Sequence, residues 1–196
     1  MKLIIVEAGD RLGKNTLIER LLNYYNFDNV SVRHFGKPPK QLPKGLKPFE
    51  YQAQCFLNEG HLLNIMDAAD SEFCYYPNVV IWNRSHIGEY VYGTMFRGES
   101  KERVADFIKS YESNFIRRIK DVTLITLTAD PEFFLHQEDG QSFSKNLEDK
   151  TKELELFKEA FELSSIPKKT IIRVNEGHSY VPKDYVFNTA INLINS

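Results

Sequence analysis

A short segment near the start of the chain holds the residues best suited to chemistry: Glu7-Ala8-Gly9-Asp10-Arg11-Leu12-Gly13-Lys14-Asn15-Thr16. It follows an apolar run and precedes an amphipathic stretch, so it joins a strand to the N-terminus of a helix. Backbone N–H groups and the helix dipole converge at such a junction, where phosphate is the natural ligand. Lys14 can then reach the outer phosphate oxygens, and a neighbouring hydroxyl can help to hold Mg²⁺. The segment therefore predicts a phosphate-binding loop.

This loop departs from the pattern G-x-x-x-x-G-K-[ST] at two positions. Ala8 stands where the first glycine belongs, and Asn15 stands where the metal-side hydroxyl belongs. We expect Gly9 to supply the backbone freedom one position later, and Asn15 and Thr16 to offer oxygen atoms to the metal. The alternative is an ordinary βα turn with an exposed lysine. The register of strand, loop and helix favours the phosphate loop.

The elements that position this loop follow a regular alternation. Expected strands cover 3–6, 30–35, 78–82, 122–127 and 170–174, and expected helices cover 17–25, 51–69, 104–119, 153–163 and 183–194. Strands that alternate with helices form a parallel sheet with right-handed crossovers. We therefore expect an α/β fold with three layers, a doubly wound five-stranded parallel sheet with helices on both faces, and a single domain over residues 1–196.

Composition narrows the class of protein. The chain has 196 residues, of which 42% are hydrophobic and 27% charged, as in globular proteins rather than disordered or membrane-spanning ones. The N-terminus lacks the length and cleavage site of a signal peptide. Cys55 and Cys74 have neither metal-binding nor redox spacing, which agrees with a reducing compartment. A net charge of −2 excludes a globally basic nucleic-acid binder but leaves local patches open.

Two segments interrupt the alternation. Residues 36–48, GKPPKQLPKGLKP, carry four prolines, four lysines and no acid, which predicts a stiff, basic surface loop. Residues 137–150 are polar and lie between an expected strand and an expected helix, where mobile lids are often found.

The loop at residues 7–16 resembles the phosphate loop of thymidylate kinases, E-G-x-D-R-x-G-K-S-T. Asn83-Arg84-Ser85-His86 stands where that family has D-R-[YHFS] after its third strand. The longer block that ends at Gly93, and the segment EDGQSF at 138–143, are more similar to thymidylate-kinase-like nucleotide kinases of bacteriophage genomes. This resemblance covers nearly the whole chain. It implies a P-loop NTPase fold of the nucleotide-kinase type.

The resemblance also implies ATP and Mg²⁺ as cofactors. The implied ATP-binding residues are Gly9, Leu12, Gly13, Lys14, Asn15 and Thr16, with the backbone amides of the loop cradling the donor phosphates. The implied metal-side residues are Asn15, Thr16 and Asn83. Asn83 replaces the aspartate of the family, and we expect that loss to weaken control of the metal.

Four residues are implied to be catalytic: Lys14, Arg11, Arg84 and Asp10. Arg84 matches the arginine that clamps the acceptor phosphate, and Asp10 matches the carboxylate that meets the acceptor 3′-hydroxyl. Arg11 matches a loop arginine that reaches the transferring phosphate in relatives whose lid is not basic. The lid of this chain contains no arginine, and a planar guanidinium suits the transition state better than an ammonium.

The acceptor side departs most from the family. Our alignment puts Asn64 and Ala68 where thymidylate kinases offer a phenylalanine and an arginine to the base, so base recognition is not inherited. The segment at 34–37 keeps one aromatic residue and one cation. The implied substrate-binding residues are Asp10, Phe35, Lys37, Asn64, Arg84 and Tyr92.

These observations predict a kinase that transfers phosphate from ATP to a deoxynucleoside monophosphate, with a thymidylate-like acceptor. Three alternatives stay open: a kinase that phosphorylates 5-hydroxymethyluracil in phage DNA held by the 36–48 loop, a deoxynucleoside kinase, and a nucleotide-binding protein with a decayed site. We expect a cytoplasmic location, that of the host if a phage encodes the chain, and no membrane partner. Whether the chain forms a homodimer stays open.

Overall fold

The computed structural model describes residues 1–26, 29–69, 77–140 and 142–196; Cys74 and Gln141 therefore lie outside the described residues. Its centre is a sheet of five parallel strands in the order β2-β3-β1-β4-β5. The strands are β1 (Lys2–Glu7), β2 (Val30–His34), β3 (Val79–Asn83), β4 (Asp121–Thr128) and β5 (Lys168–Arg173). This arrangement confirms the expected α/β fold class.

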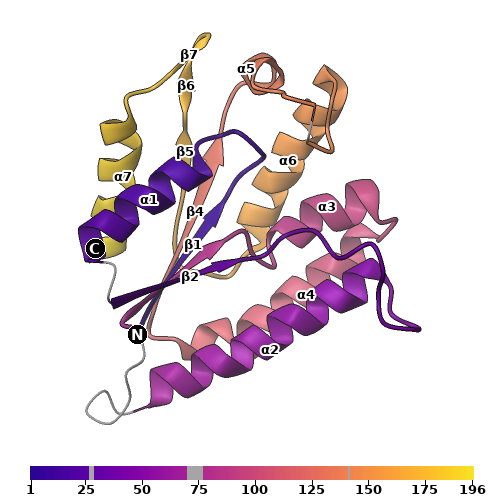
Figure 1. Ribbon diagram of the computed structural model, residues 1–196, viewed down its shortest axis with the longest axis vertical. Helices are drawn as coiled ribbons and strands as arrows, with labels where there is room; N and C mark the ends of the chain where they lie inside the picture. The colour runs from indigo at the N-terminus through magenta and orange to yellow at the C-terminus, as the bar shows by residue number, and fades with distance from the viewer. Residues whose placement is uncertain (27–28, 70–76, 141) are drawn as a thin grey trace.

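Helices cover both faces of the sheet (Figure 1). One face carries α1 (Lys14–Tyr25) and α7 (Lys183–Asn195), and the other carries α2 (Pro48–Ala68), α3 (Gly88–Phe96), α4 (Lys101–Asn114) and α6 (Leu147–Leu163). The remaining elements are a 3₁₀ turn (Ile116–Arg118), the short helix α5 (Pro131–His136) and a hairpin of β6 (Asn175–Glu176) and β7 (Ser179–Tyr180). The sheet is thus the middle one of three layers.

The alternation of side chains along β1 explains why both faces are covered. Leu3 and Ile5 pack into the core beneath α2, α3, α4 and α6, whereas Ile4 and Val6 pack into the core beneath α1 and α7. All four side chains are fully buried. A strand whose two faces are both apolar needs a helical layer on each side, which is the usual state of a parallel sheet.

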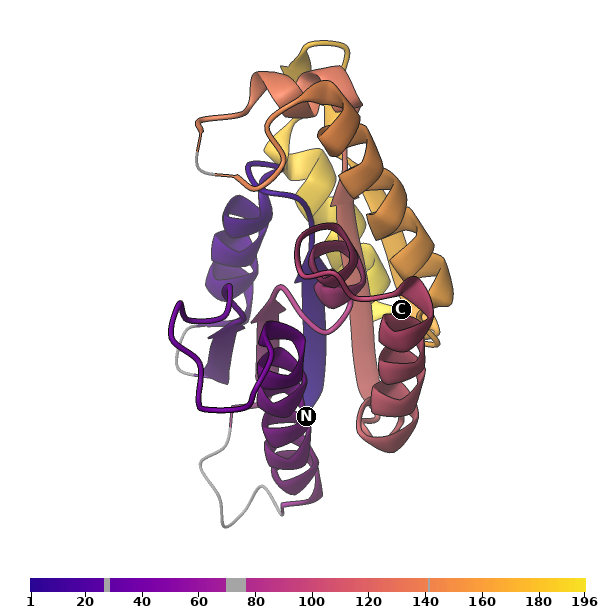
Figure 2. The same cartoon turned by 90° about the vertical axis from the view of Figure 1, so that its right-hand side faces the viewer.

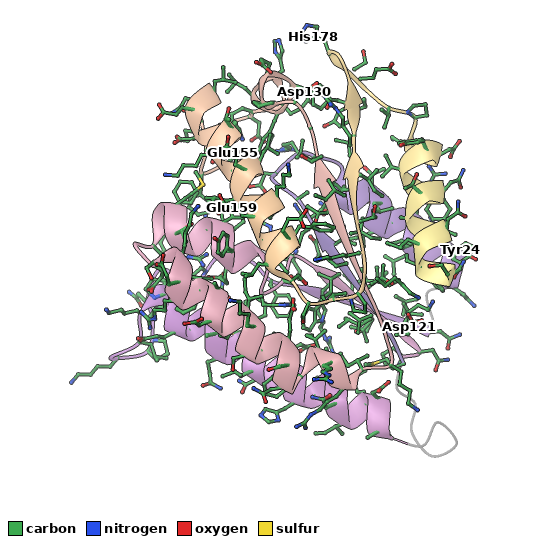
Figure 3. The ribbon with its side chains drawn as sticks, turned by 180° about the vertical axis from the view of Figure 1, so that it is seen from behind. Tyr24, Asp121, Asp130, Glu155, Glu159 and His178 are labelled. Carbon is green, nitrogen blue, oxygen red and sulfur yellow. The ribbon has the colours of Figure 1, made fainter. Side chains whose placement is uncertain are left out.

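The position of β1 between β3 and β4 brings two loops together. Val6 lies opposite Asn83 on one side and Ile125 on the other, so the segment after β1 adjoins the segment after β3. Figure 3 labels Asp121 where β4 begins and Asp130 beyond its end, near His178 of the hairpin. Ligands of open α/β sheets bind at this carboxyl edge, where the strand order reverses.

Several expected boundaries were wrong. The helix expected at 104–119 runs from Lys101 to Asn114 and is followed by the 3₁₀ turn. The helix expected at 153–163 begins at Leu147, because the Asn146 side chain caps it by accepting a hydrogen bond from the Asp149 N–H at 2.8 Å. Residues 147–150 of the expected lid are therefore helical.

The sequence pattern also missed α3, α5 and the hairpin. Residues Gly88 to Gly93 of α3 are all buried, so its sequence lacks the apolar and polar alternation that marks a surface helix. Within the described residues, no helix is both long and apolar enough to cross a membrane.

Candidate active site

The segment between β1 and α1 presents the uncapped start of a helix. Gly13 precedes α1 with φ of 85°, a left-handed conformation that glycine adopts without strain, and among the described residues no side chain caps the helix. The Lys14 side chain is only 7% exposed, and its Nζ donates hydrogen bonds to the carbonyls of Ala8 at 2.8 Å and Gly9 at 3.2 Å. Free amides and a lysine that bonds carbonyl oxygens of its own loop make a suitable site for phosphate.

Gly9 is required for a different reason than expected. It does not adopt positive φ; the left-handed residues of the loop are Arg11, with φ of 66°, and Gly13. A Cβ atom on Gly9 would lie 2.3 Å from Cζ of Phe134 and 3.0 Å from a carboxylate oxygen of Glu153. The expectation that Gly9 supplies backbone freedom was therefore wrong, and close packing of α5 and α6 against the loop explains this glycine.

A pocket of about 670 Å³ opens beside the loop, within the size range of small-molecule sites. Its polar lining residues include Asp10, Lys14, Asn15, Thr16, Asn83 and Arg84, from the loop and the end of β3. Its apolar lining residues include Leu127, Val174, Val181 and Val186. A lining of both kinds suits a ligand that carries phosphates and an apolar ring. We call it the donor pocket.

Glu7, to which the sequence analysis gave no role, joins the two loops of the site. Its fully buried Oε1 accepts hydrogen bonds from Ser85 Oγ at 2.6 Å and from the Gly88 N–H at 3.3 Å. Burial raises the pKa of Glu7 to about 7, although Ser85 and the charges of Lys14 and Arg84 oppose the rise. Burial also lowers the pKa of Lys14 to about 8. The site therefore buries one acidic and one basic group, and burial favours the neutral form of each.

Arg84 extends from the end of β3 to the phosphate loop. Its φ is 68°, and its N–H donates to the Val6 carbonyl at 3.1 Å. The guanidinium forms an ion pair with Asp10 and lies 5.7 Å from the centre of the Tyr92 ring. Tyr92 in turn donates to a buried oxygen of Glu153 at 3.1 Å. The structure thus brings together three residues that the sequence analysis assigned to the acceptor: Asp10, Arg84 and Tyr92.

A second, smaller pocket shares Arg84 with the first. Its volume is about 20 Å³, and its main lining residues are Phe35, Lys37, Phe56, Arg84, Tyr92, Arg97 and Phe143. We call it the acceptor pocket. Lys37 and Phe35 lie here as expected from their place in the sequence. Phe56, Arg97 and Phe143 were given no role. Phe143 ends the segment EDGQSF noted above, but no motif marks Phe56 or Arg97, and the three residues come from separate parts of the chain.

Asn64 does not reach either pocket. It lies on α2 about 12 Å further along the helix axis than Phe56, at 1.5 Å per residue. Gln52 and Phe56 are the α2 residues on the acceptor side: Gln52 Nε2 donates to the Gly36 carbonyl at 2.6 Å, and Phe56 lines the pocket. The assignment of Asn64 to the substrate is therefore not supported by its position.

The segment between α5 and α6 lies against the phosphate loop (Figure 2). Arg11 forms an ion pair with Asp139 in this segment, and its carbonyl accepts a hydrogen bond from the Tyr180 hydroxyl. Glu138 lies 2.7 Å from Nζ of the buried Lys150. Burial acts to raise the pKa of Glu138, but hydrogen bonds from Lys150 and Ser142 outweigh it and hold that pKa at about 2. The lid is therefore anchored to α6 by a charged pair.

The residues on the metal side fit a hydrated Mg²⁺ bound with nucleotide. Asn83 Nδ2 donates to Asn15 Oδ1 at 3.1 Å, and the buried Oδ1 of Asn83 has no hydrogen-bond partner among the described residues. No group of three or more His, Cys, Asp or Glu that could hold a metal occurs in the part of the chain that the structure describes. Because Mg²⁺ keeps several waters and takes ligands from substrate phosphates, one or two amide oxygens suffice on the protein side.

No family model matches the chain, and no curated protein matches it. Among solved structures, the YorR protein of Bacillus subtilis, crystallised with phosphorylated GDP, is 18% identical over 99% of this chain and 96% of its own, with a TM-score of 0.62.

Thymidylate kinase of Candida albicans is 16% identical over 99% of this chain and 91% of its own, with a TM-score of 0.57. Polyphosphate kinase 2 of Arthrobacter aurescens TC1 is 14% identical over 98% of this chain and 65% of its own, also with a TM-score of 0.57. At such low identity the likeness shows the fold alone. The chain has the fold of P-loop nucleotide kinases, with a parallel sheet in the order 2-3-1-4-5 and helices on both faces.

Proposed function

We propose that this protein transfers the γ-phosphoryl group of ATP to a deoxynucleoside monophosphate and requires Mg²⁺. The observation that carries the proposal is the position of Arg84, which lines both the donor pocket and the acceptor pocket. A guanidinium at that junction can contact the last phosphate of one nucleotide and the phosphate of another at the same time. The kinase-type fold supports the same reading.

The donor side binds and orients the phosphates of ATP. Lys14 exchanges the carbonyls of Ala8 and Gly9 for phosphate oxygens, and the uncapped amides at the start of α1 add further hydrogen bonds. Asn15 and Asn83 would hold Mg²⁺ that binds with ATP, and the metal would supply positive charge to the phosphates. The chemistry is mainly positioning and charge stabilisation, so the protein forms no covalent intermediate.

The acceptor side holds the second nucleotide in line. Arg84 clamps its phosphate, and Asp10, paired with Arg84, accepts a hydrogen bond from the sugar hydroxyl. Arg11 pairs with Asp139 of the lid, and an exchange of this partner for the transferring phosphate places a guanidinium on the developing charge. Closure of the lid over both pockets excludes water.

One assay separates this function from its rivals. ADP release is measured with ATP and each deoxynucleoside monophosphate, each deoxynucleoside, or DNA that contains hydroxymethyluracil, with ATP alone as the control. We expect release above the control only with monophosphates. Release only with nucleosides or DNA would replace the proposal by the matching alternative. ATP binding without release in any mixture would indicate a decayed site.

A polymeric DNA acceptor is the second candidate, and the segment between β2 and α2 favours it. All four lysines of that segment are exposed on a loop that projects from the body of the molecule (Figure 2). The segment contains no acidic residue, and Lys37 reaches the acceptor pocket. Exposed cations in a row can follow a phosphate backbone.

The salt dependence of DNA binding tests this candidate. If DNA is the acceptor, replacing Lys37, Lys40, Lys44 and Lys47 with Gln should flatten the slope of log K against log salt by about 2–4, because each neutralised phosphate contributes roughly 0.9. The control replaces Lys109, Lys120, Lys152 and Lys158, which are also exposed, so the net charge changes equally. With a free monophosphate as acceptor, DNA affinity is negligible in all three proteins, and only the acceptor KM changes, mainly through Lys37.

A further inference from the structure

One wall of the acceptor pocket comes from the lid. Phe143 lines the pocket, and its side chain is 45% exposed, whereas its neighbours Ser142 and Ser144 are 6% and 0% exposed. The backbone of this segment is therefore anchored on both sides of a large aromatic side chain that is held at the surface. Such a side chain is available to a ligand without local unfolding.

The Phe143 ring already makes the contacts that a flat ligand would make. It stacks on Phe96 with the ring centres 5.0 Å apart and the planes at 28°, and its centre lies 6.1 Å from that of Tyr92. Nζ of Lys37 lies 5.9 Å from the centre of the same ring. A nucleobase offers a π face of the same kind, so it can take the place of one of these partners.

The other walls of the pocket cannot move as easily. Phe56 is 1% exposed, and Tyr92 is 6% exposed and held by Glu153. Phe35 packs against the buried Trp82 with the ring centres 5.1 Å apart. A volume of about 20 Å³ holds about one water molecule, so a base enters only when a wall moves. Phe143 is the most exposed aromatic residue of the lining, and it lies on a loop.

We propose that Phe143 is the residue of the lid that stacks on the acceptor base. It moves aside to admit a planar heteroaromatic base and then packs on its face, so that the lid closes on an occupied acceptor pocket. This inference rests on the proposed function, and it assigns to the lid the base contact that Asn64 on α2 does not make. Phe143 acts on affinity for the base, not on the transferring phosphate.

Equilibrium dialysis with two ligands tests the proposal: a deoxynucleoside monophosphate, and 2-deoxyribose 5-phosphate, which keeps the sugar and the phosphate but has no base. We expect Phe143→Ala to weaken binding of the monophosphate by about 5- to 100-fold, the range for loss of a base–aromatic stack, and to leave binding of the sugar phosphate unchanged. Phe143→Tyr should restore the affinity. Leu147→Ala removes an apolar side chain of similar exposure, 41%, that does not line the pocket, and should change neither affinity.

Kinetics give the second readout. In the ADP-release assay, Phe143→Ala should raise KM for the monophosphate with little change in KM for ATP. Equal weakening of both dialysis ligands, a matching rise in the KM for ATP, or no change at all would overturn the assignment of Phe143 and leave the proposed function standing. Monophosphate binding that depends on Phe143, together with no ADP release in the wild-type protein, would reject the proposed function and keep the stacking role.

Discussion

The donor and acceptor pockets share Arg84 but are built in opposite ways. The donor pocket is large, at about 670 Å³, and the single segment 10–16 supplies seven of its lining residues. The acceptor pocket is small, at about 20 Å³, and is lined by aromatic and cationic side chains from α2, α3, the lid and the segments that follow β2, β3 and α3. A site made of one turn and a helix N-terminus is preorganised by local geometry. A site made of distant side chains takes its final shape from its ligand.

The largest effect should come from the donor side. We expect Lys14→Ala to lower turnover by about 100- to 1000-fold, because it removes a preorganised charge from the transferring phosphates. Steady-state ADP release measures the loss, and Lys120→Ala, which alters an exposed lysine elsewhere, is the control. Near-normal turnover by a folded Lys14→Ala protein would remove the phosphate loop from the mechanism.

Glu7 accepts hydrogen bonds from Ser85 and Gly88, which line the acceptor pocket, and its titration should be visible in the stability of the protein. Because burial raises its pKa from 4.5 to about 7, the folded protein keeps a proton that the unfolded chain has already released between these pH values. The free energy of unfolding contributed by Glu7 therefore falls as pH rises from about 4.5 to about 7.

The variant Glu7→Gln should lose this decline, since an amide does not titrate and can still accept the hydrogen bonds from Ser85 and Gly88. We expect its stability relative to the wild type to rise by about 2–3 kcal/mol across that window, as urea denaturation at a series of pH values would measure. Parallel stability curves for the two proteins would mean that Glu7 is ionised at every pH in the window.

Substitution of Arg84 tests whether the donor and acceptor pockets depend on the same guanidinium. Arg84→Lys keeps the charge but loses the fork of donors, so we expect kcat/KM for the monophosphate to fall by about 10- to 100-fold, the range for hydrogen bonds to charged groups. Arg20→Lys is the matched control, because Arg20 lines only the donor pocket. A loss confined to the KM for ATP would assign Arg84 to the donor side alone.

The smallest effect concerns the metal. We expect Asn83→Asp combined with Asn15→Ser to lower the Mg²⁺ concentration at half-maximal rate by about tenfold, because a carboxylate and a hydroxyl replace two amides that now bond each other. Mg²⁺ titration of ADP release measures it, and Asn83→Asp alone shows the share of the carboxylate. Superimposable titrations would leave Asn83 without a part in metal control.

The contrast between the pockets also explains what could be read from the sequence. The five strands were predictable because residues such as Ile4 and Ile5 lie in runs that are apolar on both faces. The loop before α1 was predictable because a strand, a Gly-Lys pair and a helix follow one another in the order of a phosphate-binding loop, and few other local structures fit that order. Its site roles nevertheless stay predictions, as do those of Arg84 and Asp10.

The acceptor side was less predictable for physical reasons. Phe56 and Phe143 are far apart in the sequence, and only the packing of α2, α3 and the lid against one another brings them together. Asn64 shows a related limit: the alignment assigned it to the substrate, whereas the α2 residue that lines the acceptor pocket is Phe56, about two turns away. We expected Gly9 to provide backbone freedom. A glycine is needed there for another reason: the Phe134 ring, which belongs to another element, leaves no room for a Cβ atom.

The central place of β1 has a consequence for how the chain is made. Lys2 pairs with Val79 on one side and with Asp121 on the other, so β1 is flanked by strands that are synthesised much later than β1 itself. At synthesis rates of about 5 to 20 residues per second, β4 is complete only roughly 6 to 25 s after synthesis of β1 begins. A nascent chain that ends before Asp121 lacks β4, so β1 has no partner on one side and the segment 8–13 is not held in place by a complete sheet. We therefore expect ribosome-bound chains to acquire nucleotide affinity late and in one step, when β4 closes the centre of the sheet.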